Sequence, residues 1–286
     1  RRSGGRSLEL PPVSAKLVVV GGGKMGEALV AGLLAAGWAK PDEIVVAEAL
    51  AARRDQLLGP EGLAGRNPGL VITASPAGVE GSEAAGALVA VKPGDTEAAC
   101  RSLAAAHVGR VLSIAAGVTL ARLQEWSGEG MPVVRAMPNT PALIGAGAAA
   151  IAPGACATEA DMAWAEEILG SVGTVVRVPE SLLDAVTGLS GSGPAYIFLV
   201  AEALIEAGVL VGLPRPVSQQ LAVQTLLGSA RLLAESDQGP EALRAAVTSP
   251  GGTTAAGLRA LEAAAVRSAF LDAVVAATER SRALGG

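Results

Sequence analysis

The stretch KLVVVGGGKMGEALVAGLLAAGW, residues 16–38, decides the fold of this chain. It opens with a short β-branched run, residues 16–20, which is typical of a buried parallel strand. Gly21, Gly23 and Gly26 follow in G-x-G-x-x-G spacing, and an apolar helical pattern comes after them. Such glycines serve a tight turn, close approach of a pyrophosphate, and close packing of helix on strand. Strand, glycines and helix in this order predict a dinucleotide-binding unit.

Further apolar runs recur along the chain at intervals long enough to hold helices. The expected strands are residues 43–47, 70–73, 87–91, 111–114, 132–136, 148–152 and 174–178, and a helix is expected at 158–169. This alternation favours a doubly wound parallel sheet of the Rossmann type. Ligands of such sheets bind at the carboxyl ends of the strands. Three segments follow strands at that edge, as cofactor neighbours or as plain loops: KPG (92–94), AAG (115–117) and MPNTP (137–141).

The choice of cofactor depends on residues after the second expected strand. Glu48 stands at its end, where an acidic residue can accept hydrogen bonds from the adenosine ribose hydroxyls and favour NAD over NADP. Arg53 and Arg54 stand a turn further on, where they can instead meet a 2′-phosphate or form a solvated helix start. The sequence leaves this choice open.

The sequence predicts that the second half of the chain is helical. We expect a mobile extension over residues 1–14, a dinucleotide-binding domain over 15–179, and an all-α domain over 180–286. The helix that begins near Pro194, AYIFLVAEALIEAG, is apolar on nearly every face, so it must be enclosed on all sides. The other expected helices are too few to enclose it: residues 182–189, 216–235, 240–247 and 254–283. The sequence therefore predicts a partner subunit, most simply in a two-fold dimer.

A glycine-rich turn precedes the last helix, in VTSPGGTTAAGL, residues 247–258. Such a turn directs free N–H groups outward and forms a partly positive pocket suited to a carboxylate. The hydroxyl of Thr254 adds a group that can donate or accept a hydrogen bond beside a bound ligand. The alternative is an ordinary helix N-cap with a flexible lead-in.

Composition excludes several classes of function. The net charge of −5 over 286 residues, without a dense basic run, argues against nucleic-acid binding. Cys100 and Cys156 are far apart and predict neither a disulfide framework nor a metal site. The longest apolar run, residues 195–213, is interrupted by Glu202 and Glu206, so we expect no membrane span. The first residues lack the hydrophobic segment of a secretion signal, and we expect a cytoplasmic protein.

The residue types that the second domain lacks limit the reactions that it can catalyse. No lysine follows Lys92, and the one histidine is His107, so residues 180–286 contain neither type. A carbonyl reductase needs a positioned acid to protonate the developing alkoxide. An imine reductase has less need, because the C=N nitrogen can arrive already protonated. The second domain therefore favours imine reduction over carbonyl reduction.

Several motifs together resemble one enzyme family. They are VVVGGGKMGEALVAGL, AVKPGD, SIAAGVTL, RAMPNTPALIGAG, LSGSGPAYIF and VTSPGGTTAAGLRALE, in this order from about residue 15 to residue 284. The chain resembles the pyrroline-5-carboxylate reductases, which make L-proline from 1-pyrroline-5-carboxylate with NADPH or NADH in the last step of proline synthesis. The resemblance implies a Rossmann domain and a helical domain that dimerises by interlocking, often within a decamer.

The resemblance also implies roles for individual residues. Those expected to hold the cofactor pyrophosphate are Gly21, Gly22, Gly23, Lys24, Met25 and Gly26. Those expected to flank the ribose and nicotinamide are Ala90, Val91, Lys92, Pro93, Ala115, Ala116 and Gly117. The turn expected to bind the substrate comprises Ser249, Gly251, Gly252, Thr253 and Thr254, with the backbone near Gly252 on the carboxylate and the Thr254 hydroxyl on the ring nitrogen. The chain departs from some members at SPAGVE, residues 75–80, where they carry a cofactor-binding Asn.

Two other functions compete with this interpretation. A hydroxyacid dehydrogenase of related architecture would need a helix-borne lysine as general acid, which residues 180–286 lack. A non-catalytic NAD(P) sensor would bind the cofactor without turnover.

Overall fold

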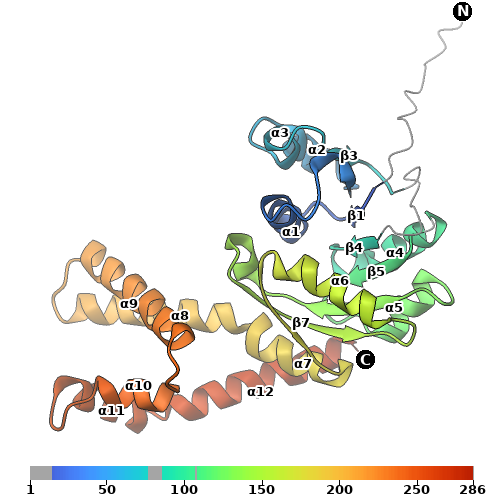
Figure 1. The fold of residues 1–286 in the computed structure, drawn as a ribbon. Helices are drawn as coiled ribbons and strands as arrows, with labels where there is room; N and C mark the ends of the chain where they lie inside the picture. The colour runs from blue at the N-terminus through green and yellow to red at the C-terminus, as the bar shows by residue number, and fades with distance from the viewer. Residues whose placement is uncertain (1–14, 77–85, 107, 286) are drawn as a thin grey trace, which may run out of the picture. The chain divides into compact units, whose positions relative to one another are not determined.

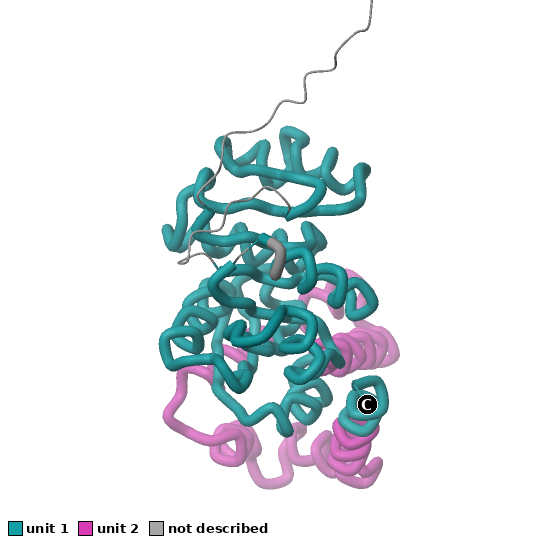
Figure 2. The backbone as a smooth tube through the Cα atoms, turned by 90° about the vertical axis from the view of Figure 1, so that its right-hand side faces the viewer, with its two compact units in different colours: residues 1–191, 278–286 teal, residues 192–277 magenta. Residues whose placement is uncertain are grey.

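The computed structural model describes residues 15–76, 86–106 and 108–285, without the side chains of Ala104 and Ala105. Two compact units divide the chain (Figure 2): residues 1–191 with 278–286, and residues 192–277. The expected extension over residues 1–14, most of the SPAGVE segment and His107 lie outside the described residues. The domain boundary expected at residue 180 stays a prediction, because units defined by contacts need not coincide with folding domains.

The first unit is built on a single sheet (Figure 1) whose strands follow the order β3-β2-β1-β4-β5-β6-β7-β8. These strands are β1 (Leu17–Val20), β2 (Ile44–Ala47), β3 (Val71–Thr73), β4 (Gly86–Val89), β5 (Arg110–Ser113), β6 (Val133–Met137), β7 (Gly147–Pro153) and β8 (Gly173–Arg177). All eight expected strands are present. β1 pairs in parallel with β2 on one side and β4 on the other, so it is a central strand.

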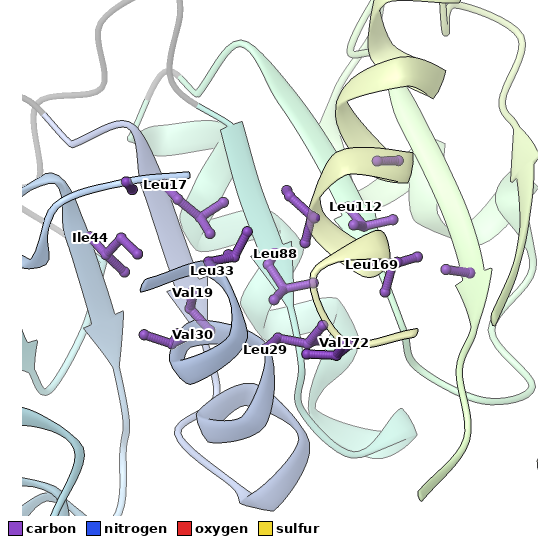
Figure 3. Close-up of a cluster of buried hydrophobic side chains, with 14 of the residues drawn as sticks. Leu17, Val19, Leu29, Val30, Leu33, Ile44, Leu88, Leu112, Leu169 and Val172 are labelled. Atoms are coloured by element: carbon purple, nitrogen blue, oxygen red, sulfur yellow. The ribbon is translucent and has the colours of Figure 1, made fainter. Parts of the chain in front are cut away.

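Helices cover both faces of this sheet. Successive side chains of a strand point to opposite faces, and those of β1 are apolar and buried on both. Leu17 and Val19 of β1 belong to a buried cluster with side chains of α1 (Lys24–Ala35) and α6 (Glu159–Gly170), part of which Figure 3 shows. Val18 and Val20 belong to a second cluster, with α4 (Thr96–Ala105) and α5 (Leu120–Ser127). The doubly wound fold class is therefore confirmed.

The remaining short helices of this unit lie in its connections. They are η1 (Pro41–Glu43), α2 (Ala51–Leu58), α3 (Leu63–Arg66), η2 (Pro93–Asp95) and η3 (Thr140–Ile144). The helix expected at 158–169 is α6, and Thr158 caps it by accepting a hydrogen bond from the Asp161 N–H while the Asp161 carboxylate accepts from the Thr158 N–H.

The expectation of a wholly parallel sheet is wrong at one end. β7 runs antiparallel to β6, with Ala136 opposite Ile151, and β8 then pairs in parallel with β7. The connection from β6 to β7 consists of residues 138–146 and holds only the short helix η3. A parallel pair needs a crossover of a dozen or more residues, so this shorter link returns the chain in the opposite direction.

The segment that leads out of the first unit is less regular than expected. The predicted helix over residues 182–189 is replaced by three short pieces: η4 (Glu180–Leu182), α7 (Leu183–Val186) and a π-helical turn, η5 (Thr187–Gly191). The hydroxyls of Thr187 and Ser190 donate to the carbonyls of Leu183 and Val186 at 2.8 and 3.1 Å. Such hydroxyl bonds compete for carbonyls of the preceding turn and often bend a helix.

The second unit is helical. Its helices are α8 (Gly193–Leu210), α9 (Arg215–Glu235), α10 (Pro240–Ala246), α11 (Thr253–Ala263) and the greater part of α12 (Val266–Gly285). No side chain of α8 is buried within the chain. By length and composition alone, the helical run Glu180–Leu210 could cross a membrane, since an 18-residue stretch within it has a mean hydropathy of 1.6. The expectation of no membrane span, which rested on the interruption of residues 195–213 by Glu202 and Glu206, stays a prediction.

The last helix is not continuous as predicted. It breaks between α11 and α12, where Ala265 adopts a left-handed backbone with a φ of 55°. The side chain of Arg267 bridges the break by donating to the Glu262 carboxylate at 2.8 Å. No glycine or proline marks the position, so the alanine-rich sequence reads as one helix.

Candidate cofactor and substrate sites

The glycine loop after β1 has a conformation that its first glycine requires. Gly21 has a φ of 106°, and its N–H donates to the Ala47 carbonyl at 2.8 Å. A Cβ on this residue would lie 2.5 Å from the Ala90 carbonyl oxygen and 3.0 Å from a Val91 methyl carbon. The turn therefore brings the loop against the segment that follows β4, and both the strain and the contacts exclude a side chain.

Of the other two glycines of the motif, one is tightly packed and the other faces open space. A Cβ on Gly26 would lie 2.1 Å from the Gly21 carbonyl oxygen, so α1 packs tightly on the loop. A Cβ on Gly23 would meet no atom within 4 Å, and Gly23 is the exposed N-cap of α1. The space before the first turn of α1, formed by Lys24 and Met25, is therefore open. Free N–H groups of a first helical turn suit a phosphate, so this loop fits a dinucleotide pyrophosphate.

The loops after β4 and β5 continue this edge of the sheet. The Ala90 N–H donates to the Val20 carbonyl at 2.8 Å, and the Ile114 N–H donates to the Val89 carbonyl at 3.0 Å. The exposed residues of the two expected segments, 92–94 and 115–117, are Lys92, Pro93, Gly94 and Ala116, whereas Ala115 is buried. Gly117 has a φ of 73°. Both expected loops therefore follow neighbouring strands, with parts of each open to a ligand.

The loop after β6 is held by an asparagine. The Asn139 side-chain oxygen accepts from the Ala148 N–H at 2.8 Å, and its side-chain nitrogen donates to the Ser190 carbonyl at 3.1 Å. Both ends of the amide are thus committed to the backbone, so Asn139 shapes the loop and joins it to the π-helical turn.

The end of α12 reaches the loop after β5, a contact that the sequence did not signal. A Cβ on Gly285 would lie 3.1 Å from the Gly117 carbonyl oxygen, and Ser281 donates to the Asp184 carboxylate at 2.6 Å. These residues are far apart in sequence but share the first compact unit.

Glu48 and Arg54 lie just beyond β2. Glu48 is 8% exposed, and its two carboxylate oxygens accept from the N–H groups of Gly22 and Leu50, each at 2.9 Å. Arg54 Nη1 donates to the carbonyls of Glu48 and Ala49 at 2.8 and 2.7 Å. Within the described part of the chain, Arg54 has no carboxylate partner.

The candidate substrate turn lies in the second unit and precedes α11. Gly251 has a φ of 68°, and the Gly252 N–H donates to the Ser249 carbonyl at 3.1 Å. A Cβ on Gly252 would lie 2.4 Å from the Ser249 hydroxyl oxygen, so a side chain here would displace that hydroxyl. Gly252 is the N-cap of α11 and no side chain caps it, which leaves the first N–H groups of the helix for water or a ligand. Thr253 is exposed and Thr254 is half-buried in that first turn.

Among the described residues, no three of His, Cys, Asp and Glu gather where they could hold a metal ion. Burial raises the pKa of the Cys100 thiol above its usual range, so this thiol stays protonated at neutral pH.

Comparison with known proteins identifies the family. A family model described as pyrroline-5-carboxylate reductase dimerisation matches residues 180–284, and one described as NADP oxidoreductase, coenzyme F420-dependent, matches residues 16–117. The pyrroline-5-carboxylate reductase of a Synechocystis strain is 45% identical to this chain, over 96% of this chain and 99% of its own length.

Solved structures agree with these matches. The pyrroline-5-carboxylate reductase of Coxiella burnetii has a TM-score of 0.86 at 34% identity, over 96% of this chain and 99% of its own. The pyrroline carboxylate reductase of Plasmodium falciparum, solved with NADP bound, has a TM-score of 0.78 at 31% identity, over 96% and 100%. The expected class, an oxidoreductase that uses NAD(P)H, and the expected dimerisation domain are both confirmed. With relatives this similar along nearly its whole length, the chain belongs to the pyrroline-5-carboxylate reductase family.

Proposed function

We propose that this protein reduces 1-pyrroline-5-carboxylate to L-proline by hydride transfer from NADPH or NADH, the last step of proline biosynthesis. The observation that carries the proposal is the 45% identity, over 96% of the chain, to a protein named for this reaction. The open glycine loop and the uncapped turn before α11 supply the two binding features that such a reaction requires.

The first unit binds the cofactor. The residues assigned to it are Gly21, Gly22, Gly23, Lys24, Met25, Gly26, Glu48, Ala90, Val91, Lys92, Pro93, Ala115, Ala116 and Gly117. The bound nicotinamide in its reduced form supplies the hydride. The first turn of α1 holds the pyrophosphate with its N–H groups, and the loops after β4 and β5 flank the ribose and the nicotinamide.

The turn before α11 binds the substrate. Its N–H groups and the positive end of the helix dipole attract the carboxylate of the imino acid. The residues assigned to this role are Ser249, Gly251, Gly252, Thr253 and Thr254. The Thr254 hydroxyl orients the ring by a hydrogen bond with its nitrogen, which makes Thr254 the candidate catalytic residue.

The residues of this turn need not supply a strong acid. Hydride attack on a protonated imine removes a positive charge, whereas attack on a ketone creates a negative one. Residues 180–286 contain neither lysine nor histidine, which suits the first reaction and not the second.

We further propose that the dimers assemble into a decamer and that the protein is cytoplasmic. The dimerisation domain and the exposed apolar side chains of α8 support assembly beyond one chain.

Turnover with the substrate tests the proposed function. The purified protein should oxidise NADPH or NADH when 1-pyrroline-5-carboxylate is added, and L-proline should accumulate in equal amount. Cofactor binding without turnover would indicate the NAD(P) sensor. Turnover with a 2-hydroxyacid and not with the imine would indicate a dehydrogenase.

A further inference from the structure

The peptide groups of Gly22 are held by two side chains of opposite charge. The Glu48 carboxylate accepts from the Gly22 N–H at 2.9 Å, and Arg53 Nε donates to the Gly22 carbonyl at 2.7 Å. Gly22 itself is buried, and a Cβ on it would lie 2.6 Å from a Leu57 methyl carbon. Gly22 stands between Gly21, with its φ of 106°, and the open N-cap Gly23, so both contacts act at the centre of the loop.

The charge of Arg53 is already committed to protein groups. Its Nη2 forms an ion pair with the Glu27 carboxylate of α1 at 2.5 Å, and its Nη1 donates to the Gln56 side chain at 3.1 Å. The two charged side chains are about a quarter exposed, at 25% and 26%. Arg66 also contacts Glu27, but at 3.4 Å and with a side chain that is 57% exposed. Arg53 thus links the loop to the first turn of α1, whereas Arg66 only touches this pair from outside.

A loop of three successive glycines needs such support. Glycine loses more conformational freedom on ordering than any other residue, and a loop that must be ordered when the ligand binds lowers the affinity. We propose that Glu48 and Arg53 are positioning residues that clamp Gly22 and so preorganise the phosphate-binding turn, whichever nicotinamide cofactor is bound. This inference rests on the proposed function, since it concerns how that cofactor site is kept in shape.

The clamp makes a prediction that simple charge effects do not. If the two side chains acted only through their charges on the cofactor phosphates, removal of the carboxylate would tighten binding and removal of the guanidinium would weaken it. If Glu48 acted through the ribose and Arg53 through a 2′-phosphate, each change would alter one cofactor more than the other. The clamp requires that each of the two changes weakens the binding of both cofactors.

The experiment measures the equilibrium Kd of NADPH and of NADH by isothermal titration calorimetry for wild type, Glu48→Gln and Arg53→Met. A hydrogen bond to a charged group contributes enough that each variant should raise both Kd values about ten-fold or more. The ratio of the two Kd values should stay within about three-fold of wild type, and KM for the imino acid should not change at saturating cofactor. Tighter binding by Glu48→Gln, or a selective loss of one cofactor in either variant, would overturn the clamp.

Two control variants match the charge changes. Arg66→Met removes the outer guanidinium from Glu27, and Asp55→Asn removes an exposed carboxylate from the same helix as Arg53. Both should leave the two Kd values within about two-fold of wild type, since neither touches Gly22. If the Arg66→Met Kd values rose as much as those of Arg53→Met, the effect would be one of charge and the clamp would be wrong.

A second variant covers the case in which Arg53→Met fails to fold. Arg53→Lys keeps a cation but offers one nitrogen in place of the guanidinium fork that reaches Gly22 and Glu27 together, so it should still raise both Kd values. Wild-type affinity in Arg53→Lys would contradict the clamp. Failure of the proposed function is separate, because it would appear as a wild-type protein that binds neither cofactor or binds one without turnover.

Discussion

At the scale of single residues, the hydroxyl of Thr254 is the group that distinguishes this turn from an ordinary helix start. Thr254→Ala should lower kcat by roughly ten- to a thousand-fold, as expected when one oriented hydrogen-bonding group is lost from the transition state. Stopped-flow and steady-state assays with 1-pyrroline-5-carboxylate measure this change. Thr254→Ser keeps the hydroxyl and should recover most of the activity. An unchanged kcat in Thr254→Ala, with an intact circular dichroism spectrum, would remove Thr254 from the mechanism.

At the scale of secondary-structure elements, the break between α11 and α12 has a measurable cost. A left-handed backbone costs an L-residue about 1–2 kcal/mol and costs glycine almost nothing, although glycine also gains entropy in the unfolded chain. Ala265→Gly should therefore raise the free energy of unfolding by about 0.5–1 kcal/mol. Ala264→Gly is the matched control, because its φ of −83° suits any residue, and it should destabilise by about 0.5–1 kcal/mol. Urea unfolding at one protein concentration checks both, and equal effects of the two variants would contradict the argument.

Some of these elements could be predicted from the sequence and others could not. The glycine loop and α1 were predictable because strand, glycines and helix are adjacent in the chain and each has a local physical signal. The reversal at β7 depends on a connection too short for a crossover, and the break at Ala265 has no glycine to mark it. The contacts of Glu48 and Arg53 with Gly22 join three segments through side-chain geometry, which no local pattern encodes. The candidate turn before α11 was predictable as a conformation, whereas its ligand was inferred from the family resemblance.

At the scale of the whole molecule, the exposed apolar side chains of α8 require a second surface to bury them. Its exposed apolar side chains include Phe198 at 63%, Leu199 at 66% and Leu210 at 86%. Each such side chain stabilises an interface by about 1.5–3 kcal/mol when it is fully buried, and a buried unpaired carboxylate costs more than that burial gains. We therefore expect the wild-type protein to sediment as a dimer or a larger assembly, and Leu199→Glu to raise the dissociation constant of the dimer at least a hundred-fold.

The same substitution at an exposed leucine of the first unit separates dimerisation from a general loss of solubility. Leu58 of α2 is 54% exposed, so Leu58→Glu should leave the sedimentation profile unchanged.

The helical run Glu180–Leu210 also meets the length and composition of a membrane span, and this alternative predicts a different outcome. A bilayer-spanning α8 would require detergent for extraction, and Leu199→Glu would then lower membrane insertion without any change in subunit association. Recovery of wild-type dimers without detergent, together with monomers of Leu199→Glu that retain the circular dichroism spectrum of wild type, would show that α8 is covered by a second copy of the chain.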